Sequence, residues 1–270
     1  MERGPLTELH SLGAHAAAML PRVASAGRAF LDLLLPRVCA TCASPLGGHE
    51  GGVICGRCWS RLALLPLPQC ARCGHPLGRD AGRHACQWCA CLPPFVRAAR
   101  SVCFVPGGTG GEIVHALKYH GWEAAADGMA DRMARVAWPQ DVISERAVVV
   151  PVPLSATRLR ERGFNQSALL ARRVAARWTL PYAAETLVRT RSTSSQTRLT
   201  PGERLGNVAG AFRVTDEARE SLRGRHVMLI DDVVTTAATL NACAAALFAA
   251  GARIVSYVTF GRARTAGDPS

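Results

Sequence analysis

The sequence contains a single lysine, Lys118, few aromatic residues, and no apolar run long enough to span a membrane. Aromatic residues make up 6% of the 270 residues and hydrophobic residues 49%, which is typical of a globular chain rather than a disordered one. A membrane-spanning helix needs about 20 consecutive apolar residues, so we expect no membrane span. Glu2, Arg3, Glu8 and His10 precede any apolar stretch and make a poor signal peptide, and we therefore predict a cytoplasmic protein.

Two common phosphate-binding motifs are also missing. The sequence has no G-x-x-x-x-G-K-[ST] loop and no G-x-G-x-x-G after an expected strand, which argues against P-loop and Rossmann-type nucleotide sites. The glycine-rich stretch Gly107 to Gly111 lacks the partners of either motif, and we predict a turn there.

The net charge of +12 is carried almost entirely by arginine. A basic balance suits nucleic acid, phosphates or an acidic membrane face, but a solvated basic surface explains it equally well. The excess of arginine over lysine is what a biased genomic composition produces, so the number of arginines alone identifies no partner.

Eight of the eleven cysteines form four C-x-x-C pairs in two copies of one unit. The pairs are Cys39/Cys42, Cys55/Cys58, Cys70/Cys73 and Cys86/Cys89, and the second copy follows the first at a spacing of 31 residues. In a reducing compartment such cysteines are metal ligands or catalysts before they are disulfides. The regular spacing indicates a duplicated metal-binding unit.

Each copy predicts a tetrahedral zinc site, because two C-x-x-C knuckles supply four thiolates. We expect about two structural Zn²⁺ ions, one per copy, although interleaved knuckles, redox pairs or an iron–sulfur cluster remain alternatives. His49, His75 and His84 lie within the copies as substitute ligands or as surface residues. Cys103 and Cys243 fall in apolar segments, and we expect them in the core.

Basic and aromatic residues are mixed within the ribbons. Arg57, Trp59, Arg61, Arg72, Arg79, Arg83 and Trp88 make up this set. The mixture suits single-stranded nucleic acid, since bases stack on aromatic rings and phosphates pair with arginines. Packing of both tryptophans inside the ribbons is an equally good interpretation.

From about residue 98 the sequence alternates between strand-like and helix-like segments. Expected strands are residues 100–105, 146–151, 226–231 and 253–260, and expected helices are residues 111–120, 123–136, 165–178 and 237–250. This alternation predicts an α/β domain with a mainly parallel sheet and helices on both faces. Ligands of such sheets bind beyond the carboxyl ends of the strands.

Asp231 and Asp232 end one buried strand at that edge. The residues that follow, from Val234 through Ala238, lead into a helix, where backbone N–H groups and the hydroxyls of Thr235, Thr236 and Thr239 form an anion cradle. Because carboxylates repel phosphate, the acids suit sugar hydroxyls or a hydroxyl-bound Mg²⁺. A ribose 5-phosphate satisfies both ends, whereas the alternative is an ordinary helix cap.

The segment resembles the phosphoribosyl pyrophosphate (PRPP) motif of type I phosphoribosyltransferases. Three further stretches, Leu117 to Gly121, Pro151 to Ala171 and Arg189 to Phe212, are similar to the ComF competence family, whose double zinc ribbon the cysteine-rich region also resembles. The resemblance covers nearly the whole chain from about Phe30 to Phe260.

The resemblance implies roles for particular residues. Asp231 and Asp232 would hold the ribose hydroxyls, and Val234 to Thr239, including Ala237 and Ala238, would wrap the 5-phosphate. Pro153 to Arg160 would form the pyrophosphate loop, with Arg158 and Arg160 as charge partners. Thr190 to Arg204 would form the family's flexible segment. Lys118, at the end of the first expected helix, lies near the same rim; contact with a phosphate and an ordinary surface position with its ammonium in solvent are equally good interpretations. Ala237 stands where these enzymes usually carry glycine.

The expected organisation is an N-terminal segment (1–29), a double zinc-ribbon domain (30–97), a phosphoribosyltransferase-like domain (98–264) and a tail (265–270). The resemblance implies binding of PRPP or a related ribose phosphate with Mg²⁺, linked to import of single-stranded DNA in natural transformation. The alternative is a non-catalytic adaptor that binds a nucleotide or DNA and recruits DNA-processing proteins through its ribbons.

Overall fold

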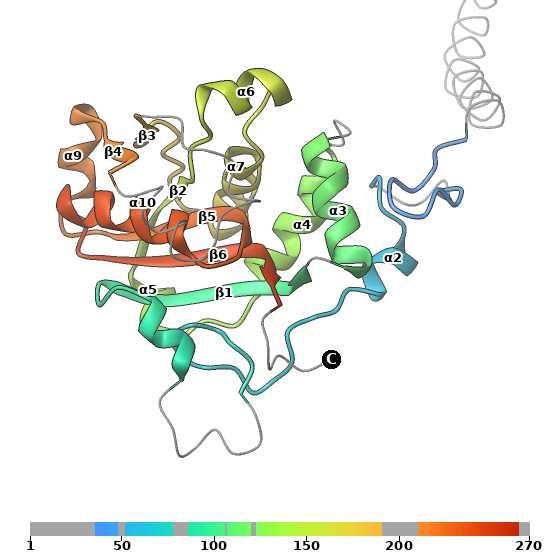
Figure 1. Ribbon diagram of the computed structural model, residues 1–270, viewed down its shortest axis with the longest axis horizontal. Coiled ribbons are helices and arrows are strands. Elements are labelled where there is room, and N and C mark those ends of the chain that lie inside the picture. Colours follow the sequence, from blue (N-terminus) through green and yellow to red (C-terminus); the bar gives the residue numbers. More distant parts are fainter. Residues whose placement is uncertain are drawn as a thin grey trace, which may run out of the picture.

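The computed structural model describes residues 36–47, 52–77, 86–105, 107–119, 123–190 and 210–264 (Figure 1). The cysteine-rich region contributes the short helix α2 (Gly56–Ser60) and the 3-10 helix η1 (Gln87–Cys91). The following elements are β1 (Val96–Val105), α3 (Gly108–Tyr119), α4 (Ala125–Ala134), α5 (Gln140–Glu145), β2 (Arg146–Pro151), α6 (Ala156–Arg162) and α7 (Gln166–Trp178). The remaining ones are β3 (Leu187–Arg189), β4 (Phe212–Val214), α9 (Asp216–Leu222), β5 (His226–Val234), α10 (Ala238–Ala249) and β6 (Ile254–Ala263).

Four strands form one parallel sheet in the order β1-β6-β5-β2, which confirms the expected α/β class. The first five residues of β5, His226 to Ile230, are all buried, as in strands that helices cover on both faces. β3 and β4 pair in an antiparallel hairpin outside this sheet. At the carboxyl edge, Pro151 of β2 lies beside Ile230 of β5, so the segments that follow both strands meet there.

The sheet separates two hydrophobic cores, and each zinc ribbon belongs to a different one. Helices α3, α4 and α7 cover one face together with the first ribbon, whose Cys58 and Leu62 are buried in that core. The contact is close, because a Cβ added to Gly128 of α4 would lie 2.4 Å from the ring of Trp59. Helix α10 and the hairpin cover the other face together with Cys73 of the second ribbon. In Figure 1, α2 accordingly lies beside α3.

Several local predictions were wrong. The glycine-rich stretch expected as a turn begins α3 at Gly108, and residues 156–160 of the expected pyrophosphate loop belong to α6. Helix α6 buries none of its residues, so its sequence shows no apolar period that would predict it. The strand that carries the acids continues to Val234, three residues beyond Asp231.

Other predictions lie outside the described residues. They concern residues 1–29 and 265–270, Gly121, His49, His84 and most of the segment from Thr190 to Arg204. Within the described part of the chain, no helix has the length and apolarity needed to cross a bilayer.

Candidate functional site

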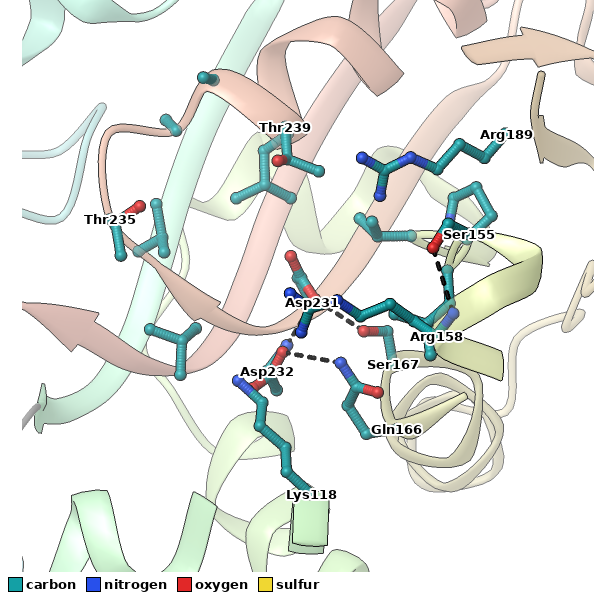
Figure 2. A pocket seen from close by; sticks show the side chains of 18 of the residues that line it. Lys118, Ser155, Arg158, Gln166, Ser167, Arg189, Asp231, Asp232, Thr235 and Thr239 are labelled. Carbon is teal, nitrogen blue, oxygen red and sulfur yellow. Dashed lines mark hydrogen bonds and ion pairs between the residues drawn. The ribbon is translucent and has the colours of Figure 1, made fainter. Parts of the chain in front are cut away.

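A cavity of about 320 Å³ opens at the carboxyl edge of the sheet, between the segments that follow β2 and β5. Residues 152–155 and Arg158 line it on one side, and residues 231–240 line it on the other. The wall also includes Lys118 of α3, Arg162 of α6, Gln166 and Ser167 of α7, and Arg189 of β3 (Figure 2). The structure therefore brings together residues that are widely separated in the sequence, at the edge where ligands of parallel sheets bind.

The two aspartates hold different partners. Ser167 Oγ donates a hydrogen bond of 2.6 Å to Asp231 Oδ1, and Gln166 Nε2 donates one of 3.3 Å to Asp232 Oδ1. The ammonium of Lys118 forms an ion pair with Asp232 Oδ2. Figure 2 shows these three side chains converging on the acids from α3 and α7. The sequence placed Lys118 either at a phosphate or in solvent, and in this structure it lies instead against the carboxylate.

The different surroundings give the two aspartates opposite pKa shifts. Burial, followed by the negative charge of Asp232, raises the pKa of Asp231 to about 7. Burial also acts to raise the pKa of Asp232, but the adjacent Lys118 ammonium outweighs it and lowers that pKa. Near neutral pH Asp232 is therefore ionised, whereas Asp231 is only partly ionised.

The segment expected to form the anion cradle lies at the N-terminus of α10. Ala237 precedes the helix in the left-handed region, with φ 58° and ψ 6°, and it offers no side chain to cap the first backbone N–H groups. The first turn of the helix contains no acidic residue. Residues 234–239 line the cavity, and Figure 2 places Thr235 on the loop that bounds it and Thr239 in the first turn of α10. Such a helix start binds anions through its N–H groups and its dipole.

The arginines that line the cavity are not all the ones expected from the sequence. Arg158 lines the cavity, and its backbone N–H donates to Ser155 Oγ, which caps α6. Arg160 lies further along the same helix and is not among the described residues that line the cavity. Arg189 of β3 does line it, although no role had been assigned to it. Its strand has only three residues and pairs with a distant segment, so no local pattern marks it.

Ser167 is a second residue that sequence reasoning missed. Ser167 lies two residues after Asn165. The Asn165 side chain accepts a 3.0 Å hydrogen bond from the Ser167 backbone N–H and so caps α7. This Asn-x-Ser helix start is a readable capping signal, and it places the Ser167 hydroxyl at the end of the helix that faces the acids.

The cysteines form two separate four-sulfur clusters. Cys39, Cys42, Cys55 and Cys58 make up the first, and Cys70, Cys73, Cys86 and Cys89 the second; within each, all sulfurs lie within 4.8 Å of one another. Each copy thus has its own site, as preferred from the sequence. Individual sulfur pairs are 3.8 Å apart in the first cluster and 3.4 and 3.5 Å in the second.

These spacings fit a single ion of zinc. A tetrahedron with zinc–sulfur bonds of about 2.3 Å has sulfur–sulfur edges of about 3.8 Å, whereas a disulfide requires about 2.05 Å. His75 is not part of the second cluster, since its ring packs on Trp88 with the centroids 5.3 Å apart. Cys103 and Cys243 lie fully buried in the two cores, as expected.

Comparison with protein families divides the chain into two matched regions. Residues 30–90 match the double zinc ribbon domain, and residues 161–270 match the phosphoribosyl transferase domain. Both matches agree with the cysteine clusters and with the parallel sheet.

Curated relatives extend over most of the chain. The DNA utilization protein YhgH of Escherichia coli K12 is 31% identical over 237 residues, which cover 83% of this chain and 96% of that protein. Competence protein F of Haemophilus influenzae is 34% identical over 93 residues (34% of this chain, 40% of that protein). Competence protein ComFC of Bacillus subtilis is 36% identical over 104 residues (38% and 39%).

Solved structures match more distantly. The glutamine PRPP amidotransferase of B. subtilis is 19% identical, with a TM-score of 0.34 over 50% of this chain and 26% of that chain. A hypoxanthine phosphoribosyltransferase of Trypanosoma cruzi is 22% identical, with a TM-score of 0.28 over 49% and 60%.

Proposed function

Because the chain belongs to the ComF competence family, in which a double zinc ribbon accompanies a phosphoribosyltransferase-type domain, we propose that it binds PRPP or a related ribose phosphate together with Mg²⁺. One observation carries the proposal. Two neighbouring carboxylates and a helix N-terminus line a single cavity of about 320 Å³, and a sugar with vicinal hydroxyls and a phosphate matches both.

Each part of the ligand has a group that suits it. The 5-phosphate would lie against the N–H groups and hydroxyls of residues 234–239. The ribose hydroxyls would lie at Asp231 and Asp232. A pyrophosphate on C1 would take Arg158 and Arg189 as charge partners, because a guanidinium matches phosphate oxygens with two parallel hydrogen bonds. Arg160 has no role in this assignment, because it does not line the cavity.

The acids also fit a magnesium ion. Burial, followed by the negative charge of Asp232, raises the pKa of Asp231, and a cation at the acids would offset both effects. Asp231 and Asp232, together with ribose hydroxyls, would hold Mg²⁺, which takes hard oxygen ligands. When bound, the ion would supply positive charge that stabilises a departing pyrophosphate. Lys118 supplies part of that charge from the protein and keeps Asp232 ionised.

The biological role we propose is the handling of single-stranded DNA in natural transformation, inside the cell. Relatives named for competence and DNA utilization support this assignment, as does the net charge of +12. The zinc ribbons would dock DNA or DNA-processing proteins. Trp59 and Trp88 both pack within the protein, Trp59 against Phe260 and Trp88 against His75, so the arginines are the better candidates for such contacts.

The left-handed Ala237 favours a second candidate, the non-catalytic adaptor. A residue with a Cβ is strained at this φ, whereas glycine is not, and the methyl group lines the place where a phosphate must approach. A site that has lost catalysis would tolerate such a residue. In that case the cavity binds a nucleotide or a DNA phosphate without transferring a ribosyl group.

Calorimetric titration with PRPP in the presence of Mg²⁺ tests the binding proposal. We expect saturable binding that weakens by about 100-fold in Asp232→Asn, since loss of a charge contact of this kind costs ~3 kcal/mol. Asp216→Asn, at an exposed position on α9, is the matched control and should bind as the native protein does. Absence of PRPP binding to the native protein would refute the proposal.

Release of pyrophosphate separates the enzyme from the adaptor. The protein is incubated with PRPP, Mg²⁺ and candidate acceptors, and pyrophosphate is measured over time. Release that disappears in Asp231→Asn supports a phosphoribosyltransferase. Binding of PRPP or of single-stranded DNA with no release for any acceptor supports the adaptor.

A further inference from the structure

We propose that Lys118 sets the cation requirement of the two acids: its ammonium occupies the place of a divalent cation at Asp232 and has to leave before such an ion binds. The inference rests on the proposed function, because it concerns the cation of the same site. Lys118 is the only lysine in the sequence, and it lies in the last turn of α3. Its ion pair with Asp232 joins this helix to β5.

Both carboxylate oxygens of Asp232 are engaged by the protein. Oδ1 accepts the hydrogen bond from Gln166 Nε2, and Oδ2 forms the ion pair with the Lys118 ammonium. Only 5% of the Asp232 side chain is exposed, so little of the carboxylate remains open to an incoming ion. Mg²⁺ takes oxygen ligands at about 2.0–2.1 Å, and at that distance from Oδ2 it would lie against the ammonium. The two positive charges repel each other, so they compete for one position.

Asp231 offers the oxygen at which a divalent ion first binds. The Ser167 hydroxyl and the backbone N–H of Asp232 both donate to Asp231 Oδ1. Among the described residues, Asp231 Oδ2 has no hydrogen-bond or ion-pair partner. Because both aspartates line the cavity, an ion that starts at Asp231 takes Asp232 as its second ligand only when the ammonium has moved away.

A second cavity gives the ammonium a place to move to. It has a volume of about 300 Å³ and is lined by Lys118, Tyr119, Arg158, Glu161, Arg162 and Phe164. Lys118 lines the first cavity as well, so its side chain lies at the boundary of the two. The carboxylate of Glu161 provides an alternative partner in the second cavity. Arg158 and Arg162 in the same wall repel the ammonium, which favours Asp232 as its partner in the free site.

The movement involves the side chain of Lys118 and leaves the helix in place. Leu117, the preceding residue, is fully buried and holds the last turn of α3 against the core. By contrast, 21% of the Lys118 side chain is exposed, and Figure 2 shows it reaching Asp232 from the end of the helix. A lysine carries a compact charge on a flexible four-carbon stem, so rotations of this stem are enough to transfer the charge.

The single lysine makes the movement measurable in the native protein. Limited acetylation of the full chain with acetic anhydride modifies Lys118 and the α-amino group, and mass spectrometry gives the ratio of the two. We expect Mg²⁺ to raise the labelling of Lys118 about tenfold over the α-amino group, because the ammonium leaves a buried ion pair. Potassium chloride at equal ionic strength controls for screening and should leave the ratio unchanged. A ratio that stays constant up to the highest Mg²⁺ concentration would overturn the inference.

Lys118→Met provides a second test, because it removes the competing charge and keeps most of the stem. Mg²⁺, titrated calorimetrically without the sugar phosphate, should bind about tenfold more tightly to this variant than to the native protein. Arg160→Met is the matched control and should bind as the native protein does, since it removes the same charge from an exposed residue that lines neither cavity. Equal affinities of Lys118→Met and the native protein, including no binding to either, would overturn the inference. If the variant fails to fold, the labelling of the native protein decides.

The outcomes separate this inference from the proposed function. Binding of ribose 5-phosphate and Mg²⁺ without a change in the labelling of Lys118 would keep the proposed function and reject the competition. Release of Lys118 by Mg²⁺ in a protein that binds no ribose phosphate would support the competition and reject the proposed function.

Discussion

At the scale of single residues, the site depends on two adjacent aspartates that ionise differently. Asp232 has Lys118 and Gln166 as partners, while the charged form of Asp231 is stabilised mainly by one hydroxyl, that of Ser167. Burial of a carboxylate beside a second carboxylate is unfavourable, and a bound cation would reduce this cost. The ionised form of Asp231 would therefore favour binding of a cation but destabilises the ligand-free protein.

The first prediction is that Asp231→Asn stabilises the ligand-free protein at pH 8. Because the pKa of Asp231 in the folded state is raised to about 7, its stabilising contribution is present below the unfolded pKa near 4 and is lost as the pH rises through 7. We expect the melting temperature of the variant to exceed that of the native protein by about 4 °C at pH 8. The gap should close as the pH falls toward 4; equal melting temperatures at pH 8 would contradict the assignment.

The raised pKa of Asp231 also predicts that binding of Mg²⁺ and ribose 5-phosphate depends on pH. The groups around it that carry or can carry charge are Asp232, Lys118, Arg189 and Cys243. Mg²⁺ and ribose 5-phosphate should bind more tightly at pH 8 than at pH 6, because Asp231 loses its proton in this interval and the ionised form is the metal ligand. Titrations of Asp231→Asn at both pH values remove the contribution of the ligand's own ionisation. A native protein with the same pH profile as the variant would refute the prediction.

A further residue-scale prediction concerns Ala237. Its φ of 58° is a conformation that glycine adopts freely, and Ala237 is one of the residues that line the cavity at the start of α10. Ala237→Gly should therefore bind ribose 5-phosphate about tenfold more tightly, as measured by titration. Ala238→Gly is the control, because residue 238 is helical and glycine there costs about 1 kcal/mol of stability without opening the cradle. Unchanged affinity in Ala237→Gly would show that the methyl group does not restrict the ligand.

At the scale of elements, the second ribbon contacts the expected anion cradle and α10, and the first ribbon does not, among the contacts of the described residues. Asn241 on α10 donates a 2.7 Å hydrogen bond to the carbonyl of Cys91, and Arg262 donates one of 2.9 Å to the carbonyl of Cys73. A small gap between the ribbon and the cradle is lined by Cys73 and Trp88 on one side and residues 234–237 on the other. The first ribbon instead contacts α4, where the guanidinium of Arg132 lies 3.7 Å from the ring of Trp59.

This difference predicts unequal effects of losing each zinc site. Cys73→Ser removes a ligand of the second site and should weaken binding of ribose 5-phosphate about tenfold, because the cradle loses its support. Cys58→Ser in the first ribbon is the matched variant; it should also lose one zinc ion, measured by metal analysis, but keep its affinity. Equal losses of affinity in the two variants, or none in either, would contradict the connection.

At the scale of the whole molecule, the ribbons are parts of the two cores rather than a separate arm. Cys39, Cys55 and Cys58 lie in the core beneath α3, α4 and α7, and Cys73 lies in the core beneath α10. The duplicated unit thus packs one copy on each face of the sheet. Structural zinc stabilises segments that have few apolar residues of their own, and here cysteines of both clusters belong to the two cores.

The sequence predicted those features whose signal is local. The C-x-x-C spacing specifies four ligands within a short segment, and the apolar run that ends at Asp231 and Asp232 identifies a buried strand with acids at its carboxyl end. Both features are present in the structure. The start of α3 was mistaken for a turn, because its glycines argue against a helix while the apolar residues that bury it follow later.

Features that depend on contacts between distant residues were not predictable. The ion pair of Lys118 with Asp232 joins α3 to β5, and only the packed sheet brings them together. Arg189 reaches the cavity from a three-residue strand whose partner, β4, follows a long connecting segment. A cavity lined by Lys118, Tyr119 and Arg162 likewise forms where the end of α3 meets α6, so neither helix alone indicates it.

A crystal structure of the protein soaked with ribose 5-phosphate and Mg²⁺ tests the central claim most directly. We predict density for the phosphate at the N–H groups of residues 237–239 and for the ribose hydroxyls, with or without the ion, at Asp231 and Asp232. Density for the sugar phosphate elsewhere, or a cradle that stays empty at saturating ligand, would contradict the account.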